Sequence, residues 1–137
     1  MLARFFVATA AAIALYLGSA HVIFTLRGPL LRPRDAALEE RMRVVSPVIT
    51  GQTTMWRVWI GVNASHGFGL VLFAAVYGYL ALAEPGVLFG SVFLPAVGGL
   101  LLLGYVVLAK TCFFRAPLRA VIAASACFAA GIVRAWM

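Results

Sequence analysis

Residues Phe5 to Leu26 read F-F-V-A-T-A-A-A-I-A-L-Y-L-G-S-A-H-V-I-F-T-L, a run of 22 residues without one charged side chain. A helix needs about 20 apolar residues to cross the hydrocarbon core of a bilayer. The run is followed by Arg27-Gly28-Pro29, and a basic residue, a glycine and a proline together are typical of a helix end. The stretch therefore predicts a membrane-spanning helix.

The same stretch shares some features with a cleaved signal peptide. Arg4 supplies a short basic region, and Gly18-Ser19-Ala20 offers the small residues at which such peptides are cut. The apolar run continues through Val22-Ile23-Phe24, beyond that point, whereas the apolar region of a signal peptide is only about 7–15 residues long. We therefore expect a retained membrane span.

The rest of the chain repeats this pattern. Of the 137 residues, 64% are hydrophobic and 11% are charged, against about 25% charged residues in ordinary soluble domains. The apolar residues fall in four long runs joined by two short turns and one longer loop. The expected fold is all-α, an integral membrane four-helix up-down bundle that forms a single domain over 1–137. Its predicted spans are residues 5–26, 55–83, 87–111 and 117–136, with a kink at Pro95 in the third.

The long polar connection between the first two spans contains a short helical pattern. Asp35 is a suitable N-cap, and the apolar residues Leu38, Met42 and Val45 recur on one helix face. The pattern predicts a short amphipathic cytoplasmic helix near residues 35–45, lying on the membrane surface. A solvated helical connector without lipid contact is an equal alternative for so short a segment.

Basic residues are distributed unequally between the two sides of the predicted bundle. Two of them, Arg4 and Arg134, fall on the side of the termini, and nine fall on the other side. Lys and Arg concentrate in cytoplasmic loops. We therefore expect a multi-pass protein of the bacterial inner (plasma) membrane, with both termini periplasmic and the 27–54 loop cytoplasmic. The nine residues are Arg27, Arg32, Arg34, Arg41, Arg43, Arg57, Lys110, Arg115 and Arg119.

The net charge of +7 indicates contact with anionic lipid head groups at the cytoplasmic side. Nucleic acid is not an expected partner, because the basic residues sit beside the spans and are not interleaved with base-stacking aromatics.

Acidic and metal-ligating residues are scarce inside the predicted spans. The chain has four acids, Asp35, Glu39, Glu40 and Glu84, and none lies in the middle of a span. Proton-coupled transporters normally use a buried carboxylate. The sequence also lacks a C-x-x-C pair and an H-x-x-x-H pair. We therefore expect no catalytic residues and no metal site, and a non-enzymatic role is favoured.

Two histidines are the most unusual polar residues of the predicted spans. Counted along each helix from the nearest cytoplasmic arginine, His21 lies six residues from Arg27 and His66 nine residues from Arg57. At 1.5 Å per residue these depths are roughly 9 and roughly 13.5 Å. Both rings can therefore lie at similar depth on neighbouring helices, and whether they face each other depends on the order of the helices in the bundle, which the sequence pattern does not determine.

Histidines on two adjacent transmembrane helices are typical axial ligands of a b-type haem, so His21 and His66 are the candidate cofactor-binding residues. Gly18, Gly67 and Gly69 would let the flat macrocycle approach. The leading expectation is nevertheless that no cofactor binds and that the polar side chains hydrogen-bond between helices. The residues expected to make these helix-to-helix contacts are Thr25, Asn63, Ser65 and His66.

Small residues recur on several predicted helix faces, at the spacing that allows close packing between membrane helices. Such faces suit packing inside the bundle, and alanine on several sides of the last helix also suits contact with another protein. The residues are Gly61, Ser65 and Gly69 in the second span, Ala96, Gly98, Gly99 and Gly104 in the third, and Ala120, Ala123, Ala124, Ala126, Ala129, Ala130 and Gly131 in the fourth.

Aromatic residues are frequent in the second predicted span and at the start of the third. We expect them to face lipid or the membrane interface, and not to line a cofactor pocket. They are Phe68, Phe73, Tyr77, Tyr79, Phe89 and Phe93.

The second span contains the run W-I-G-V-N-A-S-H-G-F-G from Trp59 to Gly69. This run resembles the W-x-G-x-N-x-S-H-x-x-G signature of a group of small, uncharacterised bacterial four-helix membrane proteins. The resemblance covers these 11 residues and the general plan of four spans. It implies the bundle fold and a common role for Asn63, Ser65 and His66, and it implies no particular activity.

Three functions are compatible with these features. The favoured one is a non-enzymatic accessory or scaffold subunit of a larger bacterial membrane complex, such as a respiratory or photosynthetic one, bound to other integral membrane proteins or to itself. The alternative is a redox protein with one b-type haem between His21 and His66. A small-molecule or lipid transporter ranks third, because no charged pathway favours it.

Overall fold

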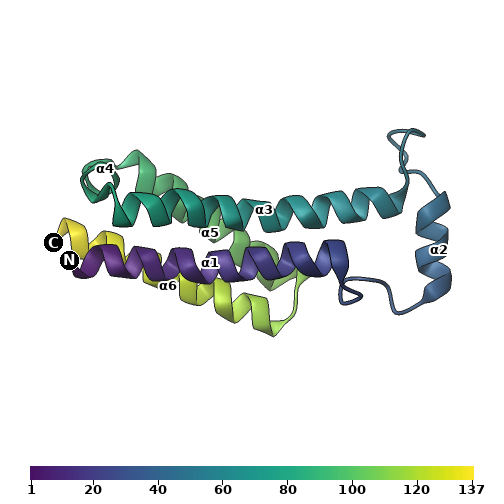
Figure 1. The fold of residues 1–137 in the computed structure, drawn as a ribbon, viewed down its shortest axis with the longest axis horizontal. Coiled ribbons are helices and arrows are strands. Elements are labelled where there is room, and N and C mark those ends of the chain that lie inside the picture. The colour runs from purple at the N-terminus through teal and green to yellow at the C-terminus, as the bar shows by residue number, and fades with distance from the viewer. The chain divides into compact units, whose positions relative to one another are not determined.

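The structure is a computed structural model that describes residues 1–137. Every regular element in it is a helix (Figure 1). The helices are α1 Leu2–Arg27, α2 Ala36–Val44, α3 Met55–Leu82, α4 Pro85–Gly90, α5 Phe93–Cys112 and α6 Arg115–Trp136.

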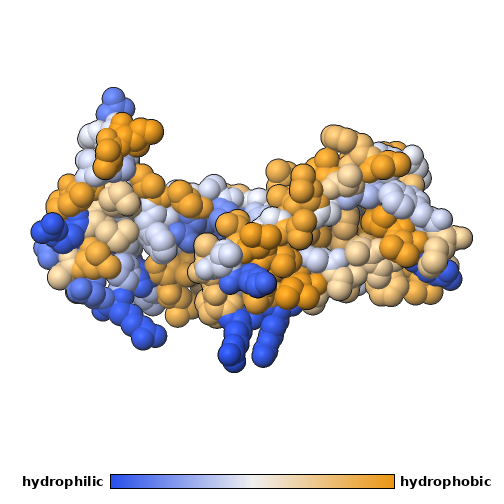
Figure 2. Space-filling view, turned by 180° about the vertical axis from the view of Figure 1, so that it is seen from behind, coloured by the Kyte–Doolittle hydropathy of each residue, from blue (hydrophilic) through white to orange (hydrophobic).

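Four helices, α1, α3, α5 and α6, are long and apolar enough to cross a membrane. Their outer faces carry large apolar side chains such as Leu72, Phe93 and Leu100, which are 65%, 73% and 72% exposed. Figure 2 shows hydrophobic surface, in orange, over much of the face that it presents. So much exposed apolar surface would be unfavourable in water and is natural in lipid. The chain is a multi-pass membrane protein, as predicted, and the up-down order of a four-helix bundle stays a prediction.

The chain divides into two compact units, which are described separately below. The terminal unit comprises Met1–Leu17 and Leu70–Met137, and the histidine unit comprises Gly18–Gly69. Each unit therefore contains one part of α1 and one part of α3.

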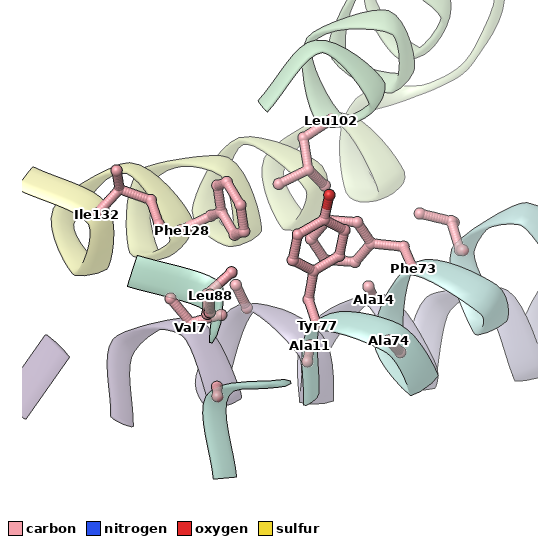
Figure 3. Packing of buried hydrophobic residues seen from close by; sticks show 13 residues of the cluster. Val7, Ala11, Ala14, Phe73, Ala74, Tyr77, Leu88, Leu102, Phe128 and Ile132 are labelled. Carbon is pink, nitrogen blue, oxygen red and sulfur yellow. The ribbon is translucent and has the colours of Figure 1, made fainter. Parts of the chain in front are cut away.

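The terminal unit is organised around a cluster of buried apolar side chains contributed by five helices (Figure 3). Three aromatic rings lie at its centre. Phe73 and Tyr77 of α3 stack with 4.6 Å between ring centroids, and Phe128 of α6 lies edge-on to Tyr77 at 5.2 Å. The Tyr77 hydroxyl donates a hydrogen bond of 2.7 Å to the Leu94 carbonyl oxygen. The expectation that Phe73 and Tyr77 face lipid is therefore wrong, because both rings fill the space between helices.

Two glycines allow helices of the terminal unit to approach closely. A Cβ atom on Gly131 would lie 2.7 Å from Val7 Cγ2 and 2.8 Å from the Ala3 carbonyl oxygen. A Cβ atom on Gly98 would lie 2.6 Å from ring atoms of Tyr77 and Phe128. Small residues at membrane helix contacts have this effect, since they bring backbones and large neighbouring side chains together.

The third predicted span, residues 87–111, differs from the structure at its start. A separate short helix, α4, ends at Gly90, and α5 begins only at Phe93. Pro95 consequently lies in the first turn of α5, where its missing N–H group disrupts no helical hydrogen bond, and the predicted single kinked span is instead two separate helices. Ser91 supports this new start, because its hydroxyl oxygen accepts a hydrogen bond from the Leu94 backbone N–H.

The polar connection of the histidine unit forms the short helix predicted near residues 35–45. The Asp35 carboxylate accepts a hydrogen bond of 2.9 Å from the Ala37 backbone N–H and caps α2 as expected. The far end of α2 is attached to the start of α3, because the Met55 N–H donates to the Val45 carbonyl oxygen at 2.8 Å. The Arg43 guanidinium also lies 4.4 Å from the centroid of the Trp56 ring.

Candidate functional site: a histidine pair between two helices

In the histidine unit, α1 and α3 approach closely at glycine positions. A Cβ atom on Gly67 would lie 2.6 Å from Val22 Cγ2 and 3.0 Å from the Gly18 carbonyl oxygen. Gly18 and Gly67 are both buried. Only glycine at position 67 permits this contact between the two backbones, and the contact determines how the neighbouring side chains at positions 21 and 66 meet.

The two histidine rings lie directly against each other. Their centroids are 5.1 Å apart, with an angle of 60° between the ring planes. His21 comes from the last two turns of α1, and His66 comes from the middle of α3. The prediction that both rings lie at similar depth on neighbouring helices agrees with this contact.

Asn63 lies one turn before His66 on α3 and is only 9% exposed. Its amide Nδ2 donates a hydrogen bond of 2.9 Å to the Trp59 carbonyl oxygen, so this part of the side chain is satisfied within its own helix.

The Nε2 atom of His21 is buried and has no hydrogen-bond partner. A buried imidazole nitrogen without a partner is unfavourable, because it has lost its hydrogen bonds to water without replacement. The buried Nε2 atom of His21 is therefore a polar group that the packing of α1 against α3 leaves unsatisfied.

The other residues predicted to link helices bond within their own helix. The Thr25 hydroxyl donates to the His21 carbonyl oxygen at 2.7 Å, and the Ser65 hydroxyl donates to the Val62 carbonyl oxygen at 2.9 Å. Serine and threonine commonly satisfy their hydroxyl group in this way inside a helix. Thr25 is buried, whereas Ser65 is exposed, and so Ser65 does not lie in the contact between α1 and α3. For these two residues the expected helix-to-helix hydrogen bonds do not form.

A haem does not fit between these rings as they lie in the structure. Trans ligation with metal–nitrogen bonds of about 2.0 Å would place the two imidazole centroids about 6.4 Å apart, and the observed separation is 5.1 Å. The macrocycle would also have to pass between helices that are in contact at Gly67, the residue next to His66. The glycines expected to admit a haem instead bring the helices together, and α1 and α3 would have to separate before one could enter.

No group of three or more His, Cys, Asp or Glu side chains is placed to hold a metal ion. A shallow pocket in the terminal unit is lined by Arg4, Phe89 and Arg134, among others, and contains neither histidine. The His21–His66 pair is therefore the feature of the structure that calls for a chemical explanation.

Sequence reasoning missed two contacts that shape the histidine unit. The Trp59 indole Nε1 donates to the Leu31 carbonyl oxygen at 3.1 Å and attaches the loop after α1 to α3. Val22 fills the space over Gly67. The sequence singles out Trp59 only as the first residue of the four-helix signature, and a valine in an apolar run carries no signal that distinguishes it from its neighbours.

No protein family, curated protein or solved structure matches this chain. The resemblance of residues 59–69 to the four-helix signature therefore stays a prediction.

Proposed function

We propose that the protein is a non-enzymatic accessory or scaffold subunit of a larger bacterial membrane complex. The observation that carries this proposal is an exposed stripe of small residues on α6. Ala123, Ala126 and Ala130 follow one another at i, i+3 and i+7, and all three are exposed. The stripe is continued at its ends by the exposed Arg119 and Arg134.

The stripe is separate from the face of α6 that packs inside the terminal unit. That inner face consists of Val121, Ala124, Phe128, Gly131 and Ile132. Association between membrane helices depends on close packing and so favours small residues, whereas lipid accepts large apolar side chains equally well. An outer face of alanines therefore suits another protein's helix better than it suits lipid.

A second helix offers the same kind of surface. A Cβ atom on Gly99 or Gly104 of α5 would meet no other atom within 4 Å. These glycines are not used for packing within the chain, in contrast to Gly98. Unused glycine on a membrane helix supports contact with a partner helix.

The test is purification from native membrane in a mild detergent, comparing the wild-type chain with Ala126→Phe. A partner present in constant ratio to the wild-type protein should be lost from the variant, because a phenyl ring on the stripe prevents close approach. Ala75→Phe is the matched control, since Ala75 is an exposed alanine on α3. Recovery of the wild-type chain only as a monomer, without a co-migrating partner, would refute the proposal.

We also propose the topology that the charge distribution predicts, with the 27–54 loop in the cytoplasm of the cell and contact between α2 and anionic lipid. Leu38, Val44, Val48 and Ile49 are 50%, 72%, 109% and 91% exposed on α2 and the loop after it. Apolar side chains exposed next to arginines support a segment that lies on a lipid surface. Labelling of a cysteine introduced at position 48 from only one side of sealed vesicles would test the orientation.

The haem alternative keeps one supporting observation, the juxtaposition of two histidines on different helices. It requires that α1 and α3 separate. A Soret absorption band in the purified protein that disappears in His66→Ala would favour it, and a colourless preparation would remove it. Transport of a small molecule or lipid stays third, since no acidic side chain lies within the spans.

A further inference from the structure

We propose that a pocket formed by α1, α4 and α6 binds the phosphate head group of one anionic phospholipid, which Arg4 and Arg134 hold. The pocket lies within the terminal unit and has a volume of about 850 Å³. Binding pockets for small molecules typically have volumes of about 300–1,000 Å³. The proposal goes beyond the accessory role, which rests on alanines of α6 and glycines of α5, and beyond the surface contact of α2 with lipid.

Close packing of α1 against α6 brings the two arginines to one place. A Cβ atom on Gly131 would lie 2.8 Å from the Ala3 carbonyl oxygen, so the two helix backbones touch there. Arg4 follows Ala3 directly, and Arg134 lies about one turn after Gly131. Both arginines therefore start beside the same helix contact, and both line the pocket.

The third wall of the pocket is α4, which a hydrogen bond attaches to the end of α6. The Trp136 indole Nε1 donates to the Phe89 carbonyl oxygen at 3.0 Å. Phe89 and Pro85 line the pocket together with residues from the first turn of α1 and the last turn of α6. Figure 1 shows both termini and α4 at one end of these helices. Contacts between three helices thus hold the pocket in place.

The two guanidinium groups lack an acidic partner within the protein. Glu84 is the only acid of the terminal unit, and it does not line the pocket. Both ion pairs of the structure use Glu39 instead. The Arg4 guanidinium lies 5.9 Å from the centroid of the exposed Phe5 ring, a contact that occupies none of its N–H groups. Two unpaired cations at one pocket favour an anionic ligand.

The lining of the pocket indicates a phospholipid and not a free anion. Phosphate oxygens match the planar donor groups of arginine. Apolar side chains, among them Leu2, Pro85 and Phe89, form much of the remaining lining. A free phosphate would leave them uncovered, whereas the glycerol backbone and first acyl carbons of a lipid would cover them. Trp136, beside the pocket, is 53% exposed, and tryptophan is typical of the head-group level of a membrane. Two positive charges favour an anionic lipid over a zwitterionic one.

The test is native mass spectrometry of the purified full chain in a mild detergent, with phosphatidylglycerol and phosphatidylcholine added in equal amounts. We expect the wild-type protein to retain one phosphatidylglycerol in preference to phosphatidylcholine. Arg4→Gln/Arg134→Gln should weaken this binding roughly 30-fold, because each arginine near an anionic lipid contributes about a factor of five. Arg115→Gln/Arg119→Gln is the matched control, since it removes two exposed arginines of α6 that do not line the pocket.

A second variant tests the pocket itself while all charges remain. Ala135 is a partly buried residue of the lining, so Ala135→Phe should fill the space and weaken phosphatidylglycerol binding with both arginines in place. Ala75→Phe, at an exposed alanine of α3, should bind the lipid as the wild type does. Elution of each variant at the wild-type volume in size-exclusion chromatography shows that it has kept its fold.

Several results would overturn the proposal. Equal retention of the two lipids by the wild-type chain would remove the preference for an anionic head group. Equal losses in the two double arginine variants, or wild-type binding by Ala135→Phe, would place the lipid outside the pocket. Displacement of phosphatidylglycerol by inorganic phosphate would show that the pocket binds a soluble anion instead.

Discussion

The terminal unit and the histidine unit differ in how they treat buried polar groups. In the terminal unit the Tyr77 hydroxyl reaches the core and has its partner, the Leu94 carbonyl oxygen. In the histidine unit Asn63 is buried, and the Nε2 atom of His21 is buried without a partner. An unsatisfied polar atom within a membrane protein is expensive and is usually retained for function. The two units therefore differ in polar satisfaction: the buried hydroxyl of the terminal unit is paired, and a buried ring nitrogen of the histidine unit is not.

Both units use glycine to bring helices together, but with different results. Gly98 and Gly131 leave room for Tyr77, Phe128 and Val7, which are large apolar side chains. Gly67 instead brings the backbones of α1 and α3 together beside the two histidine rings. Close packing stabilises the hydrophobic core in one case and brings two imidazole rings into contact in the other.

The largest effect is expected from removing the central ring of the terminal unit. Phe73 is 2% exposed and contacts both Tyr77 and Phe128. Phe73→Ala leaves a cavity and should lower the free energy of unfolding by about 3 kcal/mol, measured by titration with a denaturing detergent. Phe93→Ala, at a ring that is 73% exposed, should change it little. Equal losses in the two variants would mean that the aromatic cluster is not the core.

Replacing Gly131 or Gly67 by valine should affect the terminal unit and the histidine unit differently. Gly131→Val and Gly67→Val both overfill a helix contact, and each should lower the free energy of unfolding by about 2 kcal/mol. Only Gly67→Val should also separate the two imidazole rings, measured as loss of the nuclear Overhauser contact between His21 and His66, because it moves α1 away from α3 beside His66. Gly104→Val is the control, since its Cβ atom has open space. Loss of the ring contact in Gly131→Val would contradict this difference between the units.

The smallest effects come from single hydroxyl groups. Tyr77→Phe removes the hydrogen bond to the Leu94 carbonyl oxygen and should lower the free energy of unfolding by about 1 kcal/mol. Thr25→Val removes a hydroxyl that bonds only to a carbonyl of its own helix, and the change should stay within about 0.5 kcal/mol. The same detergent titration measures both. A larger loss for Thr25→Val would mean that Thr25 makes a contact beyond its own helix.

Much of the helical fold was predictable, because the bilayer imposes a simple requirement on length and polarity. The spans predicted at 5–26 and 55–83 correspond to α1 Leu2–Arg27 and α3 Met55–Leu82. The break before α5 was not predicted, because hydropathy alone does not show whether a proline bends a helix or begins one. Burial of Phe73 and Tyr77 was likewise missed, since an aromatic residue is equally compatible with lipid and with a helix contact.

The candidate site was predictable in part. The similar depths of His21 and His66 follow from counting residues along two helices, but the sequence left open whether the two rings face each other, because it does not determine the order of the helices. The sequence could not show which glycine lies against which helix, and it assigned Gly67 to a macrocycle when it instead closes the contact with Val22. It also could not show that Thr25 and Ser65 bond within their own helices.

The sequence by itself determined that this chain is a membrane protein with four apolar helices and two histidines in them. Length, hydropathy and charge suffice for that, because each membrane span can be recognised from its own residues alone. Only the tertiary structure decided that the two imidazoles meet at 5.1 Å and that one nitrogen of His21 is left bare. Such facts depend on the rotation and separation of two helices, which the contact of Gly67 with Val22 and Gly18 determines and which no single segment encodes.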